Sequence, residues 1–419
     1  MSRFVLQGGK KLKGEFIVAG MKNAATPILA ASMLFSQPLT LRRVPDILDV
    51  RRMCELLKGF GIKIERQGDE VTIDPGGVSA ARPSYEIVKR LRSSVLMVGP
   101  SLARFGKISF PKPGGCFIGS RPIDTHVDAF RQLGVEVTQE GNDSYTLLAK
   151  DSQKSLVILS EFSVTATENI LMYASLQEKE ITIRMAAAEP HVQDLCNFLV
   201  AAGVQIKGIG THKLTIRGKK NLHLKEWTII PDQIEVGTIA IAAAAARGDV
   251  LIHPVVPEHL DALLTKFSQI GVSYDIGKDS LHIHPGKSYK HFNLQALPYP
   301  GFPTDLQAPM AILATQAEGL SLIHDPMYEA RFSYIQELTR MGAQAVVCDP
   351  HRVLLTGVTP LYGERIKSFD LRAGATLIIA GLIAKGQTII EDAEMVDRGY
   401  ERFDERLRVI GADIKREHE

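Results

Sequence analysis

Charged and polar side chains interrupt this chain at one recurring place, the start of an apolar stretch with helical spacing. A helix amino terminus presents unpaired N–H donors and a positive dipole, which suit phosphate or carboxylate groups. We therefore expect an anion-binding site, although the formal net charge is only +2. Each residue alone could be a helix cap or part of a surface ion pair. All of them, however, stand at the same position of a repeated sequence pattern, which favours one shared site. The residues are Lys22, Asn23, Arg92, Asp305, Asp370 and Arg372.

A glycine-rich stretch, PGGCFIGSRPID, holds Cys116, the one cysteine that lies outside an apolar pattern. Glycine lowers the cost of positive φ angles and of backbone flexing, so the stretch is typical of a lid or a ligand cradle. The alternative is a surface turn with an incidental cysteine, because a short motif alone is weak evidence. Arg121 in the same stretch, and Arg398 in VDRGYER, add two cations to the anion-binding set.

Composition excludes several classes of protein. The 49 basic and 47 acidic residues nearly balance, so the chain lacks the basic field of a nucleic-acid or membrane-surface protein. No apolar run is long enough to span a bilayer, and no apolar segment follows the cationic amino terminus, so we expect a cytoplasmic protein. Four cysteines are too few for a disulfide scaffold. Cys54, Cys196 and Cys348 are expected in the core.

The histidines show no metal-binding pattern. His126 is interpreted as a polar residue at a helix start, and His253, His282 and His284 as strand or loop positions. The spacings typical of zinc, dinucleotide and nucleoside-triphosphate sites are missing from the sequence. We therefore expect neither a metal nor a cofactor.

A short phrase recurs six times, each time after an amphipathic helical run, as FGIKI, LGVEV, AGVQI, IGVSY, MGAQA and IGADI. Its glycine is expected to end the helix, and the residues after it to begin a strand. Strand-like segments precede these runs. Further upstream lie Ala-rich helices that are apolar all round, which indicates burial in a bundle. The repeated unit, about 70 residues of helix, strand, helix, strand and strand, predicts an α/β fold.

Six such units fit two domains better than one. A chain of 419 residues exceeds one ordinary core, so we expect three units in each domain. The segment VLQGGKKLKGEFIVAG resembles the hairpin that ends a unit, so the amino terminus is expected to complete the last unit. The first domain, with the Cys116 loop, would span residues 22–229, and the second would combine 1–21 with 230–419. A ligand site is expected in the cleft between them.

The segments GMKNAATPIL, PGGCFIGSRPID, PTDLQAP, FDLRAGA and DRGYER together resemble the enolpyruvyl transferases, in order, from residue 3 to residue 416. The resemblance implies a two-domain inside-out α/β barrel. It also implies transfer of the enolpyruvyl group of phosphoenolpyruvate to the 3′-hydroxyl of UDP-N-acetylglucosamine, the first committed step of peptidoglycan synthesis. In that chemistry a proton adds to C3 of phosphoenolpyruvate while the hydroxyl attacks C2, and the tetrahedral intermediate then expels phosphate.

The resemblance assigns the chemistry to four residues. Cys116 matches a proton donor that fosfomycin alkylates, and the neighbouring cations favour its thiolate. Asp305 matches the base or orienting carboxylate near the attacking hydroxyl. Lys22 and Arg398, with Arg121, match the cations that hold phosphoenolpyruvate and stabilise developing charge. The implied catalytic set is Cys116, Asp305, Lys22 and Arg398.

The resemblance also implies the substrate contacts. Pro122, Ile123, Asp124 and Thr125 fall where the family grips the uridine, Ser163 and Val164 fall near the diphosphate, and Met327 falls beside the sugar. The full substrate-binding set is Lys22, Asn23, Arg92, Arg121, Pro122, Ile123, Asp124, Thr125, Ser163, Val164, Asp305, Met327, Asp370, Arg372 and Arg398.

Three positions depart from the family pattern. Glu161 stands where lysine is common, Thr165 where glycine is common, and Gln233 where arginine is frequent. An anion in place of a cation should weaken the contact with a diphosphate. The alternatives are therefore transfer to another nucleotide-sugar, transfer to shikimate 3-phosphate, for which a loop cysteine is not used, or a catalytically silent paralogue that binds a UDP-sugar.

Overall fold

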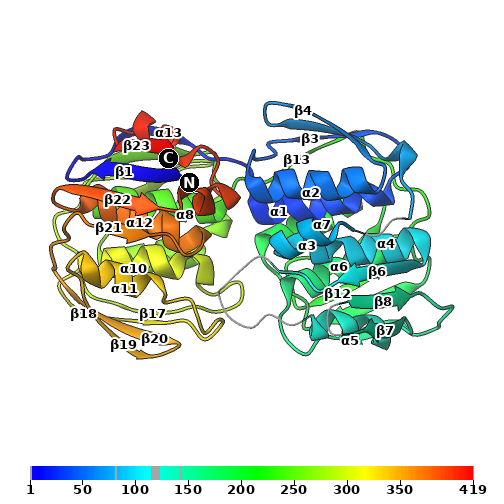
Figure 1. Cartoon of the computed structure of the whole chain (residues 1–419). Coiled ribbons are helices and arrows are strands. Elements are labelled where there is room, and N and C mark those ends of the chain that lie inside the picture. The colour runs from blue at the N-terminus through cyan, green and yellow to red at the C-terminus, as the bar shows by residue number, and fades with distance from the viewer. Residues whose placement is uncertain (1, 81–82, 115–122, 142–143, 419) are drawn as a thin grey trace. The chain divides into compact units, whose positions relative to one another are not determined.

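The computed structural model describes residues 2–80, 83–114, 123–141 and 144–418 (Figure 1). These residues form two compact units, each with its own hydrophobic core. Unit 1 contains residues 2–19 and 231–418, and unit 2 contains the described residues between 20 and 230. The chain therefore passes from unit 1 to unit 2 after Ala19 and returns after Ile230.

The Ala-rich helices lie in the two cores, as predicted. All thirteen residues of the helix that begins at Gln233 are buried, because alanine and isoleucine occupy every side of it. The apolar helices are α1 (Lys22–Ala31), α4 (Val98–Phe105), α6 (Val164–Ala174), α8 (Gln233–Ala245), α10 (Gln307–Thr315) and α12 (Leu371–Ile383). No helix within the described ranges is long and apolar enough to cross a membrane.

An amphipathic helix precedes each of the six recurring glycines. These glycines have φ angles between +86° and +106°, a range that glycine adopts at little cost. The predicted helix ends are therefore confirmed. The helices are α2 (Leu48–Gly59), α5 (Asp124–Gln132), α7 (Pro190–Ala201), α9 (Asp261–Ile270), α11 (Tyr334–Arg340) and α13 (Phe403–Val409). Shorter helical segments are α3 (Tyr85–Arg90), η1 (Ser32–Leu34), η2 (Pro75–Gly77), η3 (Arg92–Met97), η4 (Pro257–His259), η5 (Thr304–Leu306) and η6 (Ala393–Arg398).

The described residues form six small sheets, three in each unit. In unit 2 the strand orders are β13 (Glu226–Thr228), β3 (Leu39–Arg42), β5 (Glu70–Asp74), β4 (Lys63–Gln67); β6 (Lys107–Pro111), β8 (Ser144–Leu148), β7 (Glu136–Glu140); and β9 (Leu156–Ile158), β10 (Glu180–Arg184), β12 (Lys213–Arg217), β11 (Gln205–Lys207). In unit 1 they are β2 (Lys13–Ile17), β14 (Asp249–His253), β16 (Leu281–Ile283), β15 (Tyr274–Ile276); β17 (Asn293–Gln295), β18 (Gly319–His324), β20 (Arg352–Gly357), β19 (Gln344–Asp349); and β21 (Arg365–Lys367), β22 (Gln387–Glu391), β1 (Ser2–Gln7), β23 (Asp413–His418).

The amino-terminal strand completes the last sheet, as predicted, because Phe4 of β1 pairs with Ile390 of β22 and with Arg416 of β23. The hairpin expected between β1 and β2 is wrong, since β2 pairs in parallel with β14. Leu12, just before β2, is buried, and its carbonyl accepts a hydrogen bond from Asp249 N at 2.8 Å. These contacts direct the chain away from β1 and into a second sheet.

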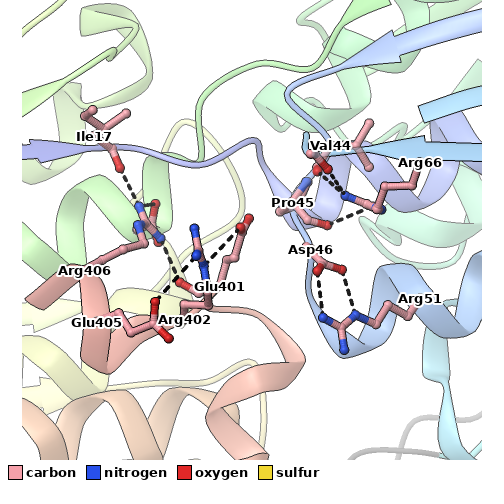
Figure 2. Close-up of polar contacts among 12 residues, drawn as sticks. Ile17, Val44, Pro45, Asp46, Arg51, Arg66, Glu401, Arg402, Glu405 and Arg406 are labelled. Atoms are coloured by element: carbon pink, nitrogen blue, oxygen red, sulfur yellow. Dashed lines mark hydrogen bonds and ion pairs between the residues drawn. The ribbon is translucent and has the colours of Figure 1, made fainter. Parts of the chain in front are cut away.

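Arg406 anchors the end of β2 within unit 1 (Figure 2). Its Nη2 donates a hydrogen bond to the Ile17 carbonyl, and its Nη1 donates to Glu235 Oε1 at 2.6 Å. The Glu235 side chain is only 3% exposed, and its Oε2 accepts a hydrogen bond from Ala19 N at 2.7 Å. Buried charged hydrogen bonds of this kind fix the last residues of unit 1 before the chain crosses.

The expected burial of the cysteines is only partly correct. Cys196 is buried in unit 2, and Cys54 is half-buried. The core position expected for Cys348 is wrong, because this residue is exposed on β19 beside Val346 and Val347, which are also exposed. β19 is an edge strand, and apolar residues alone do not separate an exposed edge from a core strand.

A buried carboxyl group makes the stability of unit 2 depend on pH. Asp194 accepts hydrogen bonds from Trp227 Nε1 at 3.2 Å and from Ile230 N at 3.4 Å. Burial raises the pKa of Asp194 to about 7 and outweighs these hydrogen bonds, which lower it. The folded state therefore keeps a proton that the unfolded state loses near pH 4, so the free energy of unfolding should fall as the pH rises from about 4 to 7.

The Asp194→Asn variant should lose this dependence. The share lost should be at most about 4 kcal/mol of the decrease in the free energy of unfolding across that window. Urea unfolding at pH 5 and pH 7.5 measures the difference, with Asp69→Asn, an exposed aspartate of unit 2, as the matched control. An equal pH dependence in Asp194→Asn and the wild type would contradict the assignment.

Candidate active site

A carboxylate held by two arginines forms the polar centre of unit 1. Asp305 lies in η5, directly before α10. Arg331 Nη2 donates to Asp305 Oδ1 at 2.6 Å, and Arg372 donates to Oδ2 through Nε at 3.1 Å and through Nη2 at 2.9 Å. The arginine side chains are 7% and 6% exposed, whereas the carboxylate is 23% exposed. The carboxylate of Asp305 is therefore accessible to solvent, whereas the two arginines that bind it are buried.

The two guanidinium groups keep Asp305 ionised. Burial alone would raise the pKa of Asp305, but Arg372 and Arg331 outweigh it and hold this pKa well below its usual range. A carboxylate with so low a pKa is a weak proton acceptor at neutral pH. It is suited to accept a hydrogen bond and to orient a hydroxyl group, which favours the orienting role among the two expected for Asp305.

A second aspartate organises the loops on either side of this cluster. Asp325, directly after β18, is fully buried. Its Oδ2 accepts a hydrogen bond from Thr304 Oγ1 at 2.6 Å, and its Oδ1 accepts one from Met327 N at 3.0 Å. Asp325 thus links the residue before Asp305 to Met327, the residue expected beside the sugar. The Met327 side chain is 36% exposed.

The neighbouring residues Asp370 and Arg372 have separate roles. Asp370 is the N-cap of α12, and its Oδ1 accepts hydrogen bonds from the backbone N–H groups of Arg372 at 2.8 Å and Ala373 at 3.1 Å. The Arg372 side chain turns instead to Asp305, and its guanidinium carbon lies 5.3 Å from the centre of the Tyr400 ring. The helix cap considered for Asp370 is therefore present, and it fixes the backbone of an arginine that contacts Asp305.

Arg398 and Gln233 also belong to unit 1. Arg398 is half-buried at the end of η6. The adjacent Asp397 accepts two hydrogen bonds from Arg416, at 2.6 and 2.7 Å. Gln233 is the first residue of α8 and is buried. A neutral amide therefore stands at this helix start, where arginine is frequent in the family pattern.

In unit 2, Lys22 is the first residue of α1 and lies against a buried aspartate. Its Nζ is 2.8 Å from Asp49 Oδ2, and the Asp49 side chain is 4% exposed. Arg52 Nη1 lies 3.8 Å from Asp49 Oδ1. Asn23 follows Lys22 in α1, and Arg92 is the first residue of η3; both are half-buried. The structure therefore places the expected residues at helix starts, as the sequence predicted.

The residues expected around the uridine and the diphosphate lie near two of the departures from the family pattern. Thr125 Oγ1 donates to Glu161 Oε1 at 3.0 Å. His126 Nε2 lies 2.9 Å from Thr165 Oγ1. Ser163, between these departures, is the N-cap of α6, and Val164 begins that helix. Ile123 is buried, and Asp124 is exposed at the start of α5.

The structure brings some predicted residues together and adds three that were not predicted. Asp305 and Arg372 are in direct contact. Cys116, Arg121 and Pro122 lie outside the described residues. The added residues are Arg331, Asp325 and Asp49. Only Arg331 carried a usable signal, because the segment MYEARF places it four residues after Met327.

Comparison with known proteins places this chain among full-length relatives. A family model described as EPSP synthase (3-phosphoshikimate 1-carboxyvinyltransferase) matches residues 6–407. Two proteins of Caldanaerobacter subterraneus, named UDP-N-acetylglucosamine 1-carboxyvinyltransferase 3 and 1, are 39% and 42% identical, with 99% of both chains covered in each comparison.

Solved structures show the same fold. The enolpyruvyl transferase NikO from Streptomyces tendae has a TM-score of 0.90 at 24% identity, over 99% of this chain and 98% of that one. EPSP synthase from Acinetobacter baumannii has a TM-score of 0.77 at 19% identity, over all of both chains. From the extent of the family model and the full-length relatives, the chain belongs to the EPSP synthase family of enolpyruvyl transferases.

Proposed function

We propose that this protein transfers the enolpyruvyl group of phosphoenolpyruvate to the 3′-hydroxyl of UDP-N-acetylglucosamine and releases phosphate, as the first committed step of peptidoglycan synthesis. The observation that carries the proposal is the ionised Asp305 between Arg331 and Arg372. It is supported by relatives at 39% and 42% identity that are named for this reaction.

We further infer that both three-repeat domains, each closed as an inside-out α/β barrel, contribute residues to the active site. In support, expected anion-binding residues start helical segments in both units, with Lys22 and Arg92 in unit 2 and Asp370 and Arg372 at the start of α12 in unit 1. Cations and helix amino termini suit a substrate that carries both a carboxylate and a phosphate.

In the proposed reaction Asp305 accepts a hydrogen bond from the 3′-hydroxyl and orients its oxygen toward C2 of phosphoenolpyruvate. Its ionised state is maintained by two arginines, so it stabilises the hydroxyl proton as the C–O bond forms. Lys22 and Arg398, with Arg121, stabilise the negative charge of the phosphate and carboxylate groups. Cys116 delivers the proton that adds to C3. The tetrahedral intermediate then expels phosphate, which carries away the hydroxyl proton, and a C3 proton returns to the Cys116 thiolate.

The contacts of Glu161 favour a second candidate, the same transfer to a different nucleotide-sugar. Glu161 accepts a hydrogen bond from Thr125, a residue expected at the uridine, and lies two residues before Ser163, a residue expected at the diphosphate. A carboxylate at this position repels a diphosphate, so it favours an acceptor with less negative charge there.

The Glu161→Lys variant tests this electrostatic effect. It should lower KM for UDP-N-acetylglucosamine about two- to five-fold with little change in kcat, because an exposed charge contributes at most about 1 kcal/mol. Steady-state kinetics with varied acceptor measures the change. The matched control is Glu180→Lys, an exposed glutamate of unit 2 at the start of β10. A KM that is unchanged, or that changes equally in the control, would argue against a diphosphate beside Glu161.

Release of phosphate from phosphoenolpyruvate tests the function itself. The acceptors are UDP-N-acetylglucosamine, other UDP-sugars and shikimate 3-phosphate, with an acceptor-free reaction as the control. Release with UDP-N-acetylglucosamine alone is the expected result. Release only with another acceptor would reassign the substrate, and no release with any of them would support a catalytically silent UDP-sugar-binding protein.

A further inference from the structure

One outward face of a sheet in unit 1 gathers imidazole and carboxylate groups that the proposed reaction does not use. In the sheet β2-β14-β16-β15, Val250, Ile252, Leu281 and Ile283 are buried. Because side chains alternate along a strand, the residues between them face the other way. Those outward residues include Asp249 and His253 of β14 and His282 of β16, and His284 follows in phase.

Three of these side chains form a compact cluster. His282 Nε2 lies 2.6 Å from Asp249 Oδ1, although the two residues are 33 positions apart in sequence. The rings of His282 and His284 have centres 4.2 Å apart. One nitrogen or oxygen atom from each of Asp249, His282 and His284 lies within 4.8 Å of the corresponding atoms of the other two. All three side chains are accessible, with 43%, 37% and 32% of their surfaces exposed.

We propose that Asp249, His282 and His284 form a surface site for a divalent transition metal of the Zn²⁺ class. Two imidazoles and one carboxylate are a ligand set that zinc binds, with a fourth position open to water. Ligand atoms around a tetrahedral zinc ion lie about 3.3 Å apart. Small side-chain rotations therefore convert the observed cluster into a coordination site.

A further carboxylate lies beside the cluster. Asp275 of β15 lies 2.8 Å from His284 Nε2 and can orient that ring or serve as a fourth ligand. On the other side, β2 brings Lys13 and Glu15 into register with Asp249 and Leu251.

The alternative is a set of metal-free ion pairs between histidines and carboxylates. His282 with Asp249, and His284 with Asp275, each have the required distance, and His253 Nε2 similarly lies 2.5 Å from Glu15 Oε1. The two arrangements respond differently to pH. A metal displaces protons from its ligands, whereas the ion pairs do not need a metal, so zinc affinity should decrease as the pH is lowered.

Zinc binding to the full chain tests the proposal. Competition between the protein and a chromophoric chelator, with Zn²⁺ as the probe, should give one equivalent of micromolar affinity at pH 7.5. Affinity should fall at least about 10-fold in His282→Ala, in His284→Ala and in Asp249→Asn. The matched controls are His291→Ala, an exposed histidine of the same unit, and Cys348→Ser, its exposed thiol. Neither control should change the affinity.

Circular dichroism of each variant shows whether it is folded, and the exposed positions of the three ligands make folding the expected result. Failure of the wild type to bind one equivalent of zinc would overturn the proposal. Binding that persists in a His282→Ala, His284→Ala double variant would overturn it as well. Loss of binding in Cys348→Ser would move the metal to the thiol, and equal loss in His253→Ala would replace the three-residue site by a diffuse one. None of these results depends on the transferase reaction.

Discussion

Replacement of Asp305 by asparagine should lower kcat about 10²- to 10³-fold, the usual range for a preorganised group that stabilises charge as it develops in the transition state. Asparagine keeps the shape of the side chain but loses the negative charge that faces solvent between Arg331 and Arg372. It can no longer stabilise the proton of an attacking hydroxyl. Phosphate release at saturating phosphoenolpyruvate and acceptor measures the effect.

The same substitution also leaves two buried guanidinium groups without their counter-ion. Breaking a buried ion pair costs about 3–5 kcal/mol, and the partial exposure of Asp305 reduces this cost. Thermal unfolding of the variant therefore has to accompany the kinetics. The matched control is Asp349→Asn, because Asp349 is 30% exposed and lies 2.6 Å from Arg352 Nη2 in the same unit. This control should lose an ion pair but keep its kcat.

An Arg331→Gln variant separates a role in the reaction from a role in folding. It keeps Asp305 and its contacts with Arg372, but it removes one of the two cations that lower the pKa of Asp305. In the wild type that pKa lies far below 5, so Asp305 is ionised throughout the neutral range and should give no acidic limb between pH 5 and 8. Loss of Arg331 raises the pKa, so an acidic limb should move upward into the measurable range.

The contribution of Asp305 to the free energy of unfolding also requires the ionised carboxylate. Because the folded-state pKa of Asp305 is depressed, its stabilising contribution is complete above the unfolded value of about 3.9 and disappears only at lower pH. A fall in kcat between pH 8 and 5 therefore reports the reaction, not the loss of this ion cluster. Full activity of a folded Asp305→Asn variant, or an unchanged pH profile in Arg331→Gln, would contradict the proposed role of Asp305.

Local features of the fold could be predicted because single residues determine them. A recurring glycine after an amphipathic run predicted a helix end, and all six adopt a positive φ angle. Helices rich in alanine and isoleucine were expected in the core, since no side of them is polar. The pairing of β1 with the last sheet followed from an incomplete sixth repeat.

Features that depend on pairing between distant residues could not be predicted in the same way. The three-residue edge strands β9, β13, β17 and β21 are too short to show an alternating pattern. The solvent-facing position of Cys348 depends on which strand forms the sheet edge. The turn of β2 into the sheet of β14 depends on the burial of Leu12.

The candidate site shows the same division. The starts of α1, α10 and α12 could be recognised because charged residues precede apolar ones. The contact between Arg331 and Asp305 could not be recognised, because the two residues are 26 positions apart and tertiary packing holds the loop of Arg331. Gln307, the first residue of α10, donates from Nε2 to the Arg331 carbonyl at 3.3 Å. Its Oε1 accepts a hydrogen bond from Tyr334 at 3.0 Å. No spacing rule encodes such a set of contacts.

Replacement of Cys116 by aspartate should leave enolpyruvyl transfer measurable and abolish inhibition by fosfomycin. A carboxylic acid can still donate a proton to C3 of phosphoenolpyruvate, but it is not alkylated as a thiolate is. Replacement by serine should lose most of the activity, because a hydroxyl group is a much weaker acid than a thiol. Cys116→Ser and Cys116→Asp therefore separate the need for an acidic proton from the need for sulfur.

The experiment follows phosphate release over time after preincubation with fosfomycin. The wild type should lose activity progressively, whereas Cys116→Asp should keep its rate at every inhibitor concentration. Cys348→Ser is the matched control, because Cys348 is an exposed cysteine of unit 1 outside the proposed site. This variant should keep both activity and sensitivity. The control is needed because any accessible thiol could otherwise account for the inactivation. Continued sensitivity of Cys116→Asp, or resistance of Cys348→Ser, would show that alkylation occurs elsewhere and would remove the reason to assign the proton donor to Cys116.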